Sequence, residues 1–305
     1  NWICSKPHLT MQKLMNEPFL YKTRSERYDN FNAFIETKLR LYPYTKGMDF
    51  SEFDAIFLGS DQIWEASITD GKFDDVFFGT GAKCKVISYA ASNKAKVLTS
   101  QEIDYYQQHL SKYAGIGVRE ITLQKLLSDV IRKPVVFTVD PTILAGNLLT
   151  DGIESKRPIE QKYVLVYEIV EHQKVIEQAK RYAKKIGARV VMLNAYIEYT
   201  EKRICDFTAS PSDFVNYIRY AECVFTTSFH GTAISIICNT NFYSFKQHNA
   251  SDLRISSLLS IAGLNDRFVE MVDDLDIKQI DYSNVLKNVE MATEISRDFI
   301  KYALS

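Results

Sequence analysis

The stretch ECVFTTSFHGTAIS, residues 222–235, carries the clearest fold signal in the chain. Its first part, 222–226, has the apolar, β-branched and aromatic character of a buried strand. Polar and small residues follow, and an apolar segment with helical spacing begins at Phe229. A buried strand that leads directly into a helix is the basic unit of a parallel α/β sheet.

The same alternation of strand and helix signals continues on both sides of this stretch, and it predicts parallel strands joined by crossover helices. Ser210 before Pro211 is a helix-start signal, and Gly187 after a basic segment is a helix-end signal. The expected strands are 54–58, 85–90, 115–118, 134–139, 163–169, 189–193, 222–226 and 242–245. The expected helices lie near 26–40, 100–113, 120–128, 172–186, 211–220, 229–238, 252–261 and 284–303.

The chain length predicts two domains, because 305 residues exceed what a single hydrophobic core usually contains. The polar segment TDGIESKRPIEQK, 150–162, contains Gly and Pro and separates two series of strands and helices, so it is the expected linker. We therefore expect one Rossmann-like domain over residues 1–150 and a second over 151–305, which face a common cleft. The last helix is expected to pack back on the first domain.

Composition and charge exclude several functional classes. The chain has 37 Lys and Arg against 38 Asp and Glu, so its formal charge of -1 gives no electrostatic basis for binding nucleic acid. Its five cysteines form no C-x-x-C pair and its histidines show no metal-ligand spacing, so neither disulfides nor a metal site are predicted. With no membrane-length apolar run and no signal peptide, we expect a cytoplasmic protein.

Common cofactor and nucleophile motifs are missing from the sequence. No G-x-G-x-x-G follows a strand and no G-x-x-x-x-G-K-[ST] occurs, so dinucleotide and ATP binding by these loops are not predicted. No serine lies in a G-x-S-x-G elbow, which argues against a hydrolase of that type.

Polar side chains follow five of the expected strands at their carboxyl ends. In parallel sheets ligands bind at this edge, because the loops converge there and helix N-termini point inward. Each segment also has a local structural interpretation: a capped turn at Asp61, a strand-ending turn at Asp140, and a surface ion pair of Arg119 with Glu120. The segments are GSDQIW at 59–64, AS at 91–92, RE at 119–120, DPT at 140–142 and TSFHG at 227–231.

His230 is the strongest single candidate, because it lies in the first turn of the helix that follows strand 222–226. Ser228 is placed to cap this helix, and Gly231 would leave backbone N–H groups open to an anion. A bound anion favours the protonated imidazole, which can then donate a proton at neutral pH. The segment therefore predicts a site for a phosphate or carboxylate, with His230 as the acid.

Taken together and in this order, FLGSDQIW, ISYAAS, GVRE, VDPT and TTSFHG resemble the polysaccharide pyruvyl transferase family over about residues 50–270. The resemblance implies a two-domain fold similar to that of GT-B glycosyltransferases. It also implies transfer of the pyruvyl group of phosphoenolpyruvate to a sugar as a ketal, with release of phosphate and no further cofactor. The implied partners are this small-molecule donor and a saccharide acceptor, including a lipid-linked sugar at the inner face of the membrane.

Family members normally open with a strand and a loop rich in Gly and Asn, and no such segment precedes residue 50 here. Since the sequence also begins with Asn1 rather than Met, we expect it to start inside a longer gene product. The expected first domain would then lack its first strand and would form the acceptor side.

The resemblance implies roles for individual residues at matching positions. Arg119 and Arg254 would bind the phosphate or carboxylate, since a guanidinium binds such groups in a bidentate way. Asp61 would hold or deprotonate an acceptor hydroxyl. The helix start would contribute Ser228, His230, Gly231 and Thr232 to the donor site, and further substrate contacts are expected from Gly59, Ser60, Ser92 and Asp140.

Two other functions are consistent with the same sequence features. In a sugar-nucleotide-dependent glycosyltransferase with this fold, the helix at residue 229 would bind a diphosphate. A catalytically silent binding module in polysaccharide assembly would need neither a donor site nor an acid.

Overall fold

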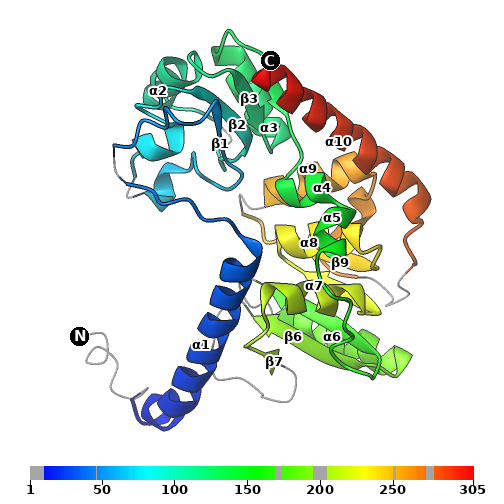
Figure 1. The fold of residues 1–305 in the computed structure, drawn as a ribbon. Coiled ribbons are helices and arrows are strands. Elements are labelled where there is room, and N and C mark those ends of the chain that lie inside the picture. Colours follow the sequence, from blue (N-terminus) through cyan, green and yellow to red (C-terminus); the bar gives the residue numbers. More distant parts are fainter. Residues whose placement is uncertain are drawn as a thin grey trace. The chain divides into compact units, whose positions relative to one another are not determined.

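The computed structural model of the chain describes residues 10–45, 47–69, 71–95, 97–168, 173–194, 205–249, 252–272 and 278–305. It confirms the α/β class, with two separate sheets of parallel strands and helices packed against them (Figure 1). Two compact units divide the chain. Unit 1 consists of Asn1–Leu41, Thr150–Phe245 and Val269–Gln279, and unit 2 of Tyr42–Leu149, Lys246–Phe268 and Ile280–Ser305.

The sheet of unit 1 reverses its strand order next to its central strand, β5. Its strands are β5 (Tyr163–Glu168), β6 (Arg189–Asn194), β7 (Cys205–Asp206), β8 (Cys223–Thr226), β9 (Phe242–Phe245) and β10 (Phe268–Val269). The spatial order is β10-β9-β8-β5-β6-β7, so the chain first builds outward on one side of β5 and then on the other. The point between β5 and β8 is where ligands bind in open α/β sheets of this kind.

Three helices of unit 1 follow the strands as crossovers, namely α6 (Gln173–Ile186), α7 (Pro211–Arg219) and α8 (Phe229–Ile237). The apolar face of α6 packs Ile176 and Ala179 against Val164 and Phe225 of the sheet, and all four side chains are buried. α7 begins with the expected cap, since Ser210 and Asp213 form a reciprocal capping box and Pro211 is the first helical residue.

Helix α1 (Thr10–Lys38) also belongs to unit 1, where the Asn30 side chain donates a hydrogen bond to the Thr208 carbonyl oxygen at 2.7 Å. The sequence-based start of this helix at residue 26 is wrong, because the helix begins sixteen residues earlier at Thr10. Pro18 lies inside the helix, and proline is normally a helix-breaking signal, so pattern reasoning favours a later start.

Unit 2 contains a four-stranded parallel sheet whose spatial order, β1-β2-β3-β4, follows the chain. Its strands are β1 (Ala55–Leu58), β2 (Lys85–Ala91), β3 (Gly115–Val118) and β4 (Val135–Phe137). Its helices include α2 (Ser100–Leu110), α3 (Ile121–Val130), α4 (Pro141–Ala145), α9 (Asp252–Ala262) and α10 (Tyr282–Leu304), with short 3₁₀ turns at Ala66–Ile68, Asp75–Phe78 and Asn265–Arg267. α5 (Asn147–Asp151) spans the change of unit between Leu149 and Thr150, which is where the expected linker begins.

Helix α10 completes the core of unit 2 on one face of the sheet (Figure 1). Phe299 and Ala303 of α10 are buried against Ile87 and Tyr89 of β2. Gly115 of β3 is required there, because a Cβ at this position would lie 2.7 Å from the Cβ of Ala303. The other face of the sheet carries a larger cluster around the fully buried Trp64.

The units differ from the expected division at residue 150 in three segments. Residues 1–41 group with the second half of the chain, and residues 246–268 and 280–305 group with the first. The last of these segments contains α10, which packs with the first half of the chain as expected. The other two follow from packing that chain order does not reveal. The two-residue strands β7 and β10 were not predicted, since two residues show no periodicity. Residue 169 of the expected strand and residue 172 of the expected helix lie outside the described residues.

Candidate functional site

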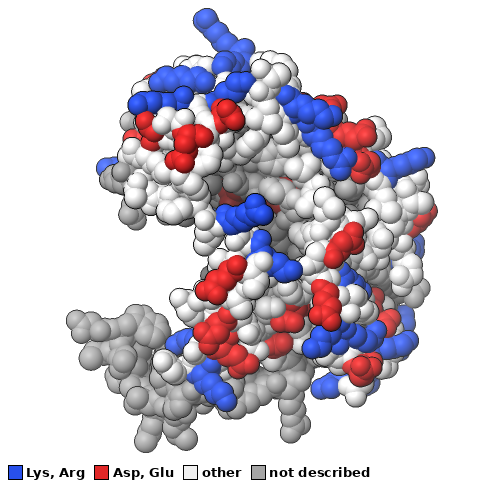
Figure 2. All heavy atoms as spheres, in the orientation of Figure 1, with Lys and Arg blue, Asp and Glu red and all other residues white. Residues whose placement is uncertain are grey.

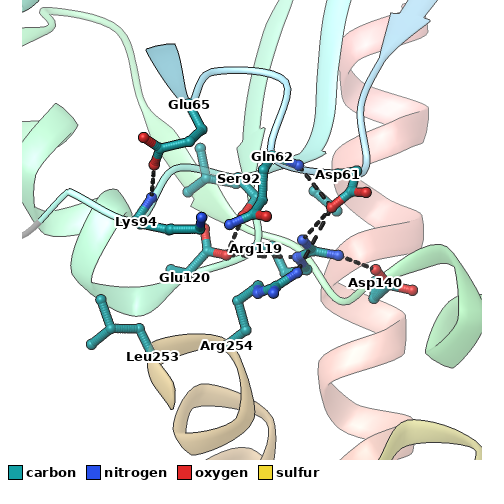
Figure 3. A network of polar contacts seen from close by, with 12 residues as sticks. Asp61, Gln62, Glu65, Ser92, Lys94, Arg119, Glu120, Asp140, Leu253 and Arg254 are labelled. Atoms are coloured by element: carbon teal, nitrogen blue, oxygen red, sulfur yellow. Dashed lines mark hydrogen bonds and ion pairs between the residues drawn. The ribbon is translucent and has the colours of Figure 1, made fainter. Parts of the chain in front are cut away.

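Polar side chains from all four strand ends of unit 2 come together at one edge of its sheet (Figure 3). α9 adds Arg254 from a distant part of the sequence. Five of the residues selected from the sequence therefore lie in one cluster, namely Asp61 after β1, Ser92 after β2, Arg119 after β3, Asp140 at the start of α4, and Arg254.

Arg119 is the buried centre of this cluster, with only 3% of its side chain exposed. Its Nη1 atom lies 2.6 Å from Oδ2 of Asp140, and its Nη2 atom lies 3.5 Å from Oδ1 of Asp61. The interpretation of Arg119 as a surface ion pair is therefore wrong. Asp140 also has the expected capping role, because its Oδ1 atom accepts a hydrogen bond from the Thr142 N–H at the start of α4.

Arg254 is less fully paired than Arg119. Its Nη1 atom lies 3.7 Å from Oδ1 of Asp61, beyond hydrogen-bond distance, and its buried Nε atom has no hydrogen-bond partner in the described part of the chain. Burial and then the charge of Arg119 lower the pKa of Arg254, against the opposing effect of the nearby carboxylates. Arg119 and Arg254, here called the arginine pair, thus repel each other, and an oxyanion bound between them would relieve that repulsion.

Asp61 forms the open end of the cluster, because 77% of its side chain is exposed. Its Oδ1 atom accepts a hydrogen bond from the Gln62 N–H at 2.8 Å and faces both guanidinium groups. Asp61 is therefore in contact with the arginine pair and also accessible from solvent.

The loop that leads to Asp61 approaches β2 closely at Gly59. Gly59 has a φ of +139°, and a Cβ there would overlap the carbonyl oxygen of Tyr89. Only glycine fits at position 59, because the loop passes so close to β2. The next residue, Ser60, is partly buried.

Glu120 is the residue of the cluster that sequence reasoning missed. Its side chain is 1% exposed, and its Oε1 atom accepts a hydrogen bond from Ser92 Oγ at 2.6 Å and lies 3.6 Å from Nε of Arg119. Burial raises the pKa of Glu120, although the Ser92 hydrogen bond and the charges of both arginines act in the opposite direction. Its position directly after Arg119 in GVRE was visible in the sequence, but it indicated only a salt-bridge partner.

The remaining candidates lie in unit 1 at the start of α8. His230 is an exposed residue in the first turn of this helix, and the Phe229 ring meets its imidazole edge-on at 5.4 Å. α8 follows β8, so His230 lies at the carboxyl end of a strand that borders the reversal of strand order. This is the position that open α/β sheets use for ligands, and the helix N-terminus there favours anions.

Gly231 and Thr232 have structural contacts at the start of α8. The N–H of Gly231 donates a hydrogen bond to Ser228 Oγ at 3.3 Å, so it is used by the helix cap. A Cβ on Gly231 would overlap Oγ1 of Thr226, so close packing of α8 on β8 explains this glycine. The Thr232 hydroxyl is fully buried, where it contacts Ser228 O at 3.0 Å and Ser244 Oγ at 2.7 Å.

Replacing Gly231 by Ala is expected to destabilise unit 1 by about 1–3 kcal/mol, because the added methyl group overpacks the contact between α8 and β8. Denaturant unfolding measures this change. Because the clash is with Thr226 Oγ1, the double variant Gly231→Ala/Thr226→Ala should be less destabilised than the sum of the single variants. Additive effects would show that α8 does not pack as described.

Three general features concern surface charge, metal binding and membrane insertion. On the face shown in Figure 2, basic and acidic side chains are interspersed rather than gathered in one broad basic patch. Among the described residues, no cluster of three or more His, Cys, Asp or Glu side chains is arranged to hold a metal ion. None of the described helices has both the length and the apolar character needed to span a bilayer.

The sequence profile of polysaccharide pyruvyl transferases matches residues 12–249 of the chain. The chain belongs to the polysaccharide pyruvyl transferase family. It is therefore a transferase that acts in polysaccharide modification. Within the matched region lie Asp61, Arg119 and His230, whereas Arg254 follows it by five residues. No curated protein sequence matches the chain.

The solved structures to which the chain is similar are distant in sequence. A protein described as a UDP-N-acetylglucosamine 2-epimerase from Listeria monocytogenes has 9% identity and a TM-score of 0.43, over 92% of this chain and 73% of that one. MnaA from S. aureus, solved with UDP, has 9% identity and a TM-score of 0.42, over 90% and 72%. The wall teichoic acid polymerase TagF, as the H548A variant, has 11% identity and a TM-score of 0.36, over 72% and 69%.

Proposed function

We propose that this transferase moves the pyruvyl group of phosphoenolpyruvate to a saccharide as a ketal and releases phosphate. Family membership supports the reaction class. The observation that carries the choice of donor is the arginine pair, in which Arg254 Nε is buried and has no hydrogen-bond partner among the described residues. Phosphoenolpyruvate suits this pair because it has a phosphate and a carboxylate, and guanidinium groups bind both in a bidentate way.

The donor oxyanion is proposed to replace the Asp61 carboxylate between the two guanidinium groups. Asp61 is suited to move away, since it is largely exposed and its contacts of 3.5 and 3.7 Å with the arginines are long. Arg119 is suited to stay in place, because the buried Asp140 holds it at 2.6 Å. Once displaced, Asp61 would be available to bind an acceptor hydroxyl as a hydrogen-bond acceptor.

The proposed chemistry has two steps. In the first, His230 as an imidazolium delivers a proton to the methylene carbon of the enol, and an acceptor hydroxyl adds to the neighbouring carbon. The proton of that hydroxyl passes to solvent, from which the imidazole is protonated again. In the second, another hydroxyl of the acceptor displaces phosphate from the same carbon, and its proton leaves with the phosphate. Positive charge from the arginines would stabilise the phosphate as it departs. The donor is a substrate, and the proposal assigns no further cofactor.

We further propose that the acceptor is a sugar of a polysaccharide or of its precursor. A lipid-linked sugar would bring the enzyme to the inner face of the membrane as a peripheral protein. Association with acceptor-bearing vesicles, but not with plain vesicles, would support this part of the proposal.

A phosphate-release assay tests the donor assignment. With saccharide acceptors present, phosphoenolpyruvate should release phosphate and a panel of nucleotide sugars should release no nucleotide. Release of nucleotide instead would establish a glycosyltransferase, for which the N-terminus of α8 at the strand-order reversal would bind the diphosphate. Absence of turnover with every donor and acceptor would indicate a silent binding module.

A further inference from the structure

Glu120 is a buried carboxyl group that the proposed reaction does not use. Its Oε2 atom is inaccessible and has no hydrogen-bond partner among the described residues, although its Oε1 atom is bound by Ser92. A buried, unsatisfied carboxylate oxygen is costly unless a charge nearby or a bound proton compensates it. The charges of two guanidinium groups act on it, those of Arg119, which directly follows β3, and of Arg254 on α9 (Figure 3).

The charges around the arginine pair suggest a function for the buried Glu120 carboxyl group. Two guanidinium groups are surrounded by three carboxyl groups, those of Asp61, Glu120 and Asp140. If all three carboxyl groups are ionised, the cluster is already negative overall before any anion binds. A phosphate or carboxylate that displaces Asp61 then comes close to Glu120, and two anions at short range repel each other strongly in a buried setting.

Asp140 and Asp61 differ from Glu120 in how they can respond. Asp140 is held in place by a 2.6 Å ion pair and by its role as the cap of α4. Asp61 can turn into solvent because its side chain is 77% exposed. Glu120 is 1% exposed and cannot leave, so only its protonation state is able to change.

We propose that Glu120 is a positioning residue that acts through the arginine pair: ionised, it holds the two guanidinium groups in place in the unoccupied site, and it takes up a proton when an oxyanion binds between them. This inference rests on the oxyanion site of the proposed function. It adds that each bound dianion brings one proton into the protein, which lessens the charge that the arginines must compensate.

The direction of the pH dependence follows from the groups that face Glu120. Burial raises the pKa of Glu120 in the unoccupied protein, whereas the Ser92 hydrogen bond, the charges of Arg119 and Arg254, and the Asn93 backbone N–H lower it. Tyr106 of α2 also interacts with Glu120, and burial raises the pKa of this phenol, so Tyr106 stays neutral. A bound anion raises the pKa of Glu120 further. Anion affinity should therefore be highest at pH values below the Glu120 pKa of the unoccupied protein. Between this pKa and the higher Glu120 pKa of the anion-bound protein, the affinity should fall by up to about tenfold per pH unit. Above the higher pKa it should no longer change.

Isothermal titration of sulfate into the whole protein tests this proposal, because sulfate remains a dianion between about pH 5 and 8, where the titration is run. The dependence of the binding heat on the ionisation heat of the buffer gives the number of protons taken up. We expect uptake that approaches one proton per sulfate in the wild type. Glu120→Gln should abolish the uptake and make sulfate affinity nearly independent of pH.

Three further variants separate Glu120 from other sources of protons. Glu290→Gln removes an exposed carboxylate on α10 and should leave the uptake unchanged. His230→Gln should also retain the uptake that depends on Glu120. Ser92→Ala removes a hydrogen bond that lowers the Glu120 pKa, so the fall in affinity should begin at higher pH. If Glu120→Gln does not fold, the appearance of a protonated carboxyl band in the infrared difference spectrum of the wild type on sulfate addition provides the same test.

The outcomes are distinguishable. Sulfate binding without proton uptake, or with uptake that survives in Glu120→Gln, would overturn the role of Glu120 and leave the oxyanion site intact. Failure of the wild type to bind sulfate or phosphoenolpyruvate at all would overturn the oxyanion site itself.

Discussion

Arg254→Gln is expected to lower kcat/KM for phosphoenolpyruvate by about a hundredfold to a thousandfold, the range measured when one donor to a developing anionic charge is removed. The physical reason is that Arg254 is nearly buried and that, among the described residues, its Nε has no hydrogen-bond partner and its ion pair with Asp61 is 3.7 Å long. The guanidinium of Arg254 can therefore bind the substrate without first losing a strong contact within the protein. Steady-state phosphate release at several donor concentrations measures the loss.

Arg297→Gln is the matched control for this variant. Arg297 is about half exposed on α10, and its guanidinium lies 2.7 Å from Glu290, so its loss should change kcat/KM less than twofold. Thermal unfolding of both variants separates a binding defect from a folding defect. A folded Arg254→Gln enzyme with wild-type kcat/KM would remove Arg254 from the site.

His230→Asn is expected to lower kcat by about a hundredfold to ten-thousandfold, the usual contribution of a positioned general acid. The KM for phosphoenolpyruvate should change little, because the proposed role of the imidazole is proton delivery and anion binding is assigned to the arginine pair. The substitution should be tolerated by the fold, since His230 is exposed in the first turn of α8. Single-turnover measurements of ketal formation would show the loss in the chemical step.

His109→Asn provides the comparison, because His109 stacks on Tyr105 at 4.2 Å within the aromatic cluster of unit 2, apart from the candidate residues. It should lower stability more than activity. An unchanged kcat for His230→Asn would contradict the assignment of His230 as the acid, while leaving the donor site of unit 2 unaffected.

Much of the fold could be predicted because strand and helix signals alternate clearly from β1 to β9. The strand expected at 115–118 coincides with β3, and that at 242–245 with β9. Selecting the polar residues that follow the expected strands also predicted which side chains lie close together, since parallel strands end at one edge of a sheet. This is why Asp61, Ser92 and Arg119, far apart in the sequence, were selected together and lie together.

Other features depend on packing that a single sequence does not display. The grouping of Arg254 with Arg119 follows from the burial of α9 and α10 in unit 2, far along the chain from its strands. Gly231 illustrates a second limit, because a glycine needed for close packing and a glycine needed for anion binding have the same sequence signature. Glu120 was overlooked for a similar reason, since burial distinguishes it from an ordinary surface partner of arginine.

A crystal structure with phosphoenolpyruvate or sulfate bound is the most direct test of the oxyanion site. The proposal predicts an oxyanion within hydrogen-bond distance of the guanidinium groups of both Arg119 and Arg254, with Asp61 turned away from them. An anion bound elsewhere, with Asp61 still between the two arginines, would contradict it.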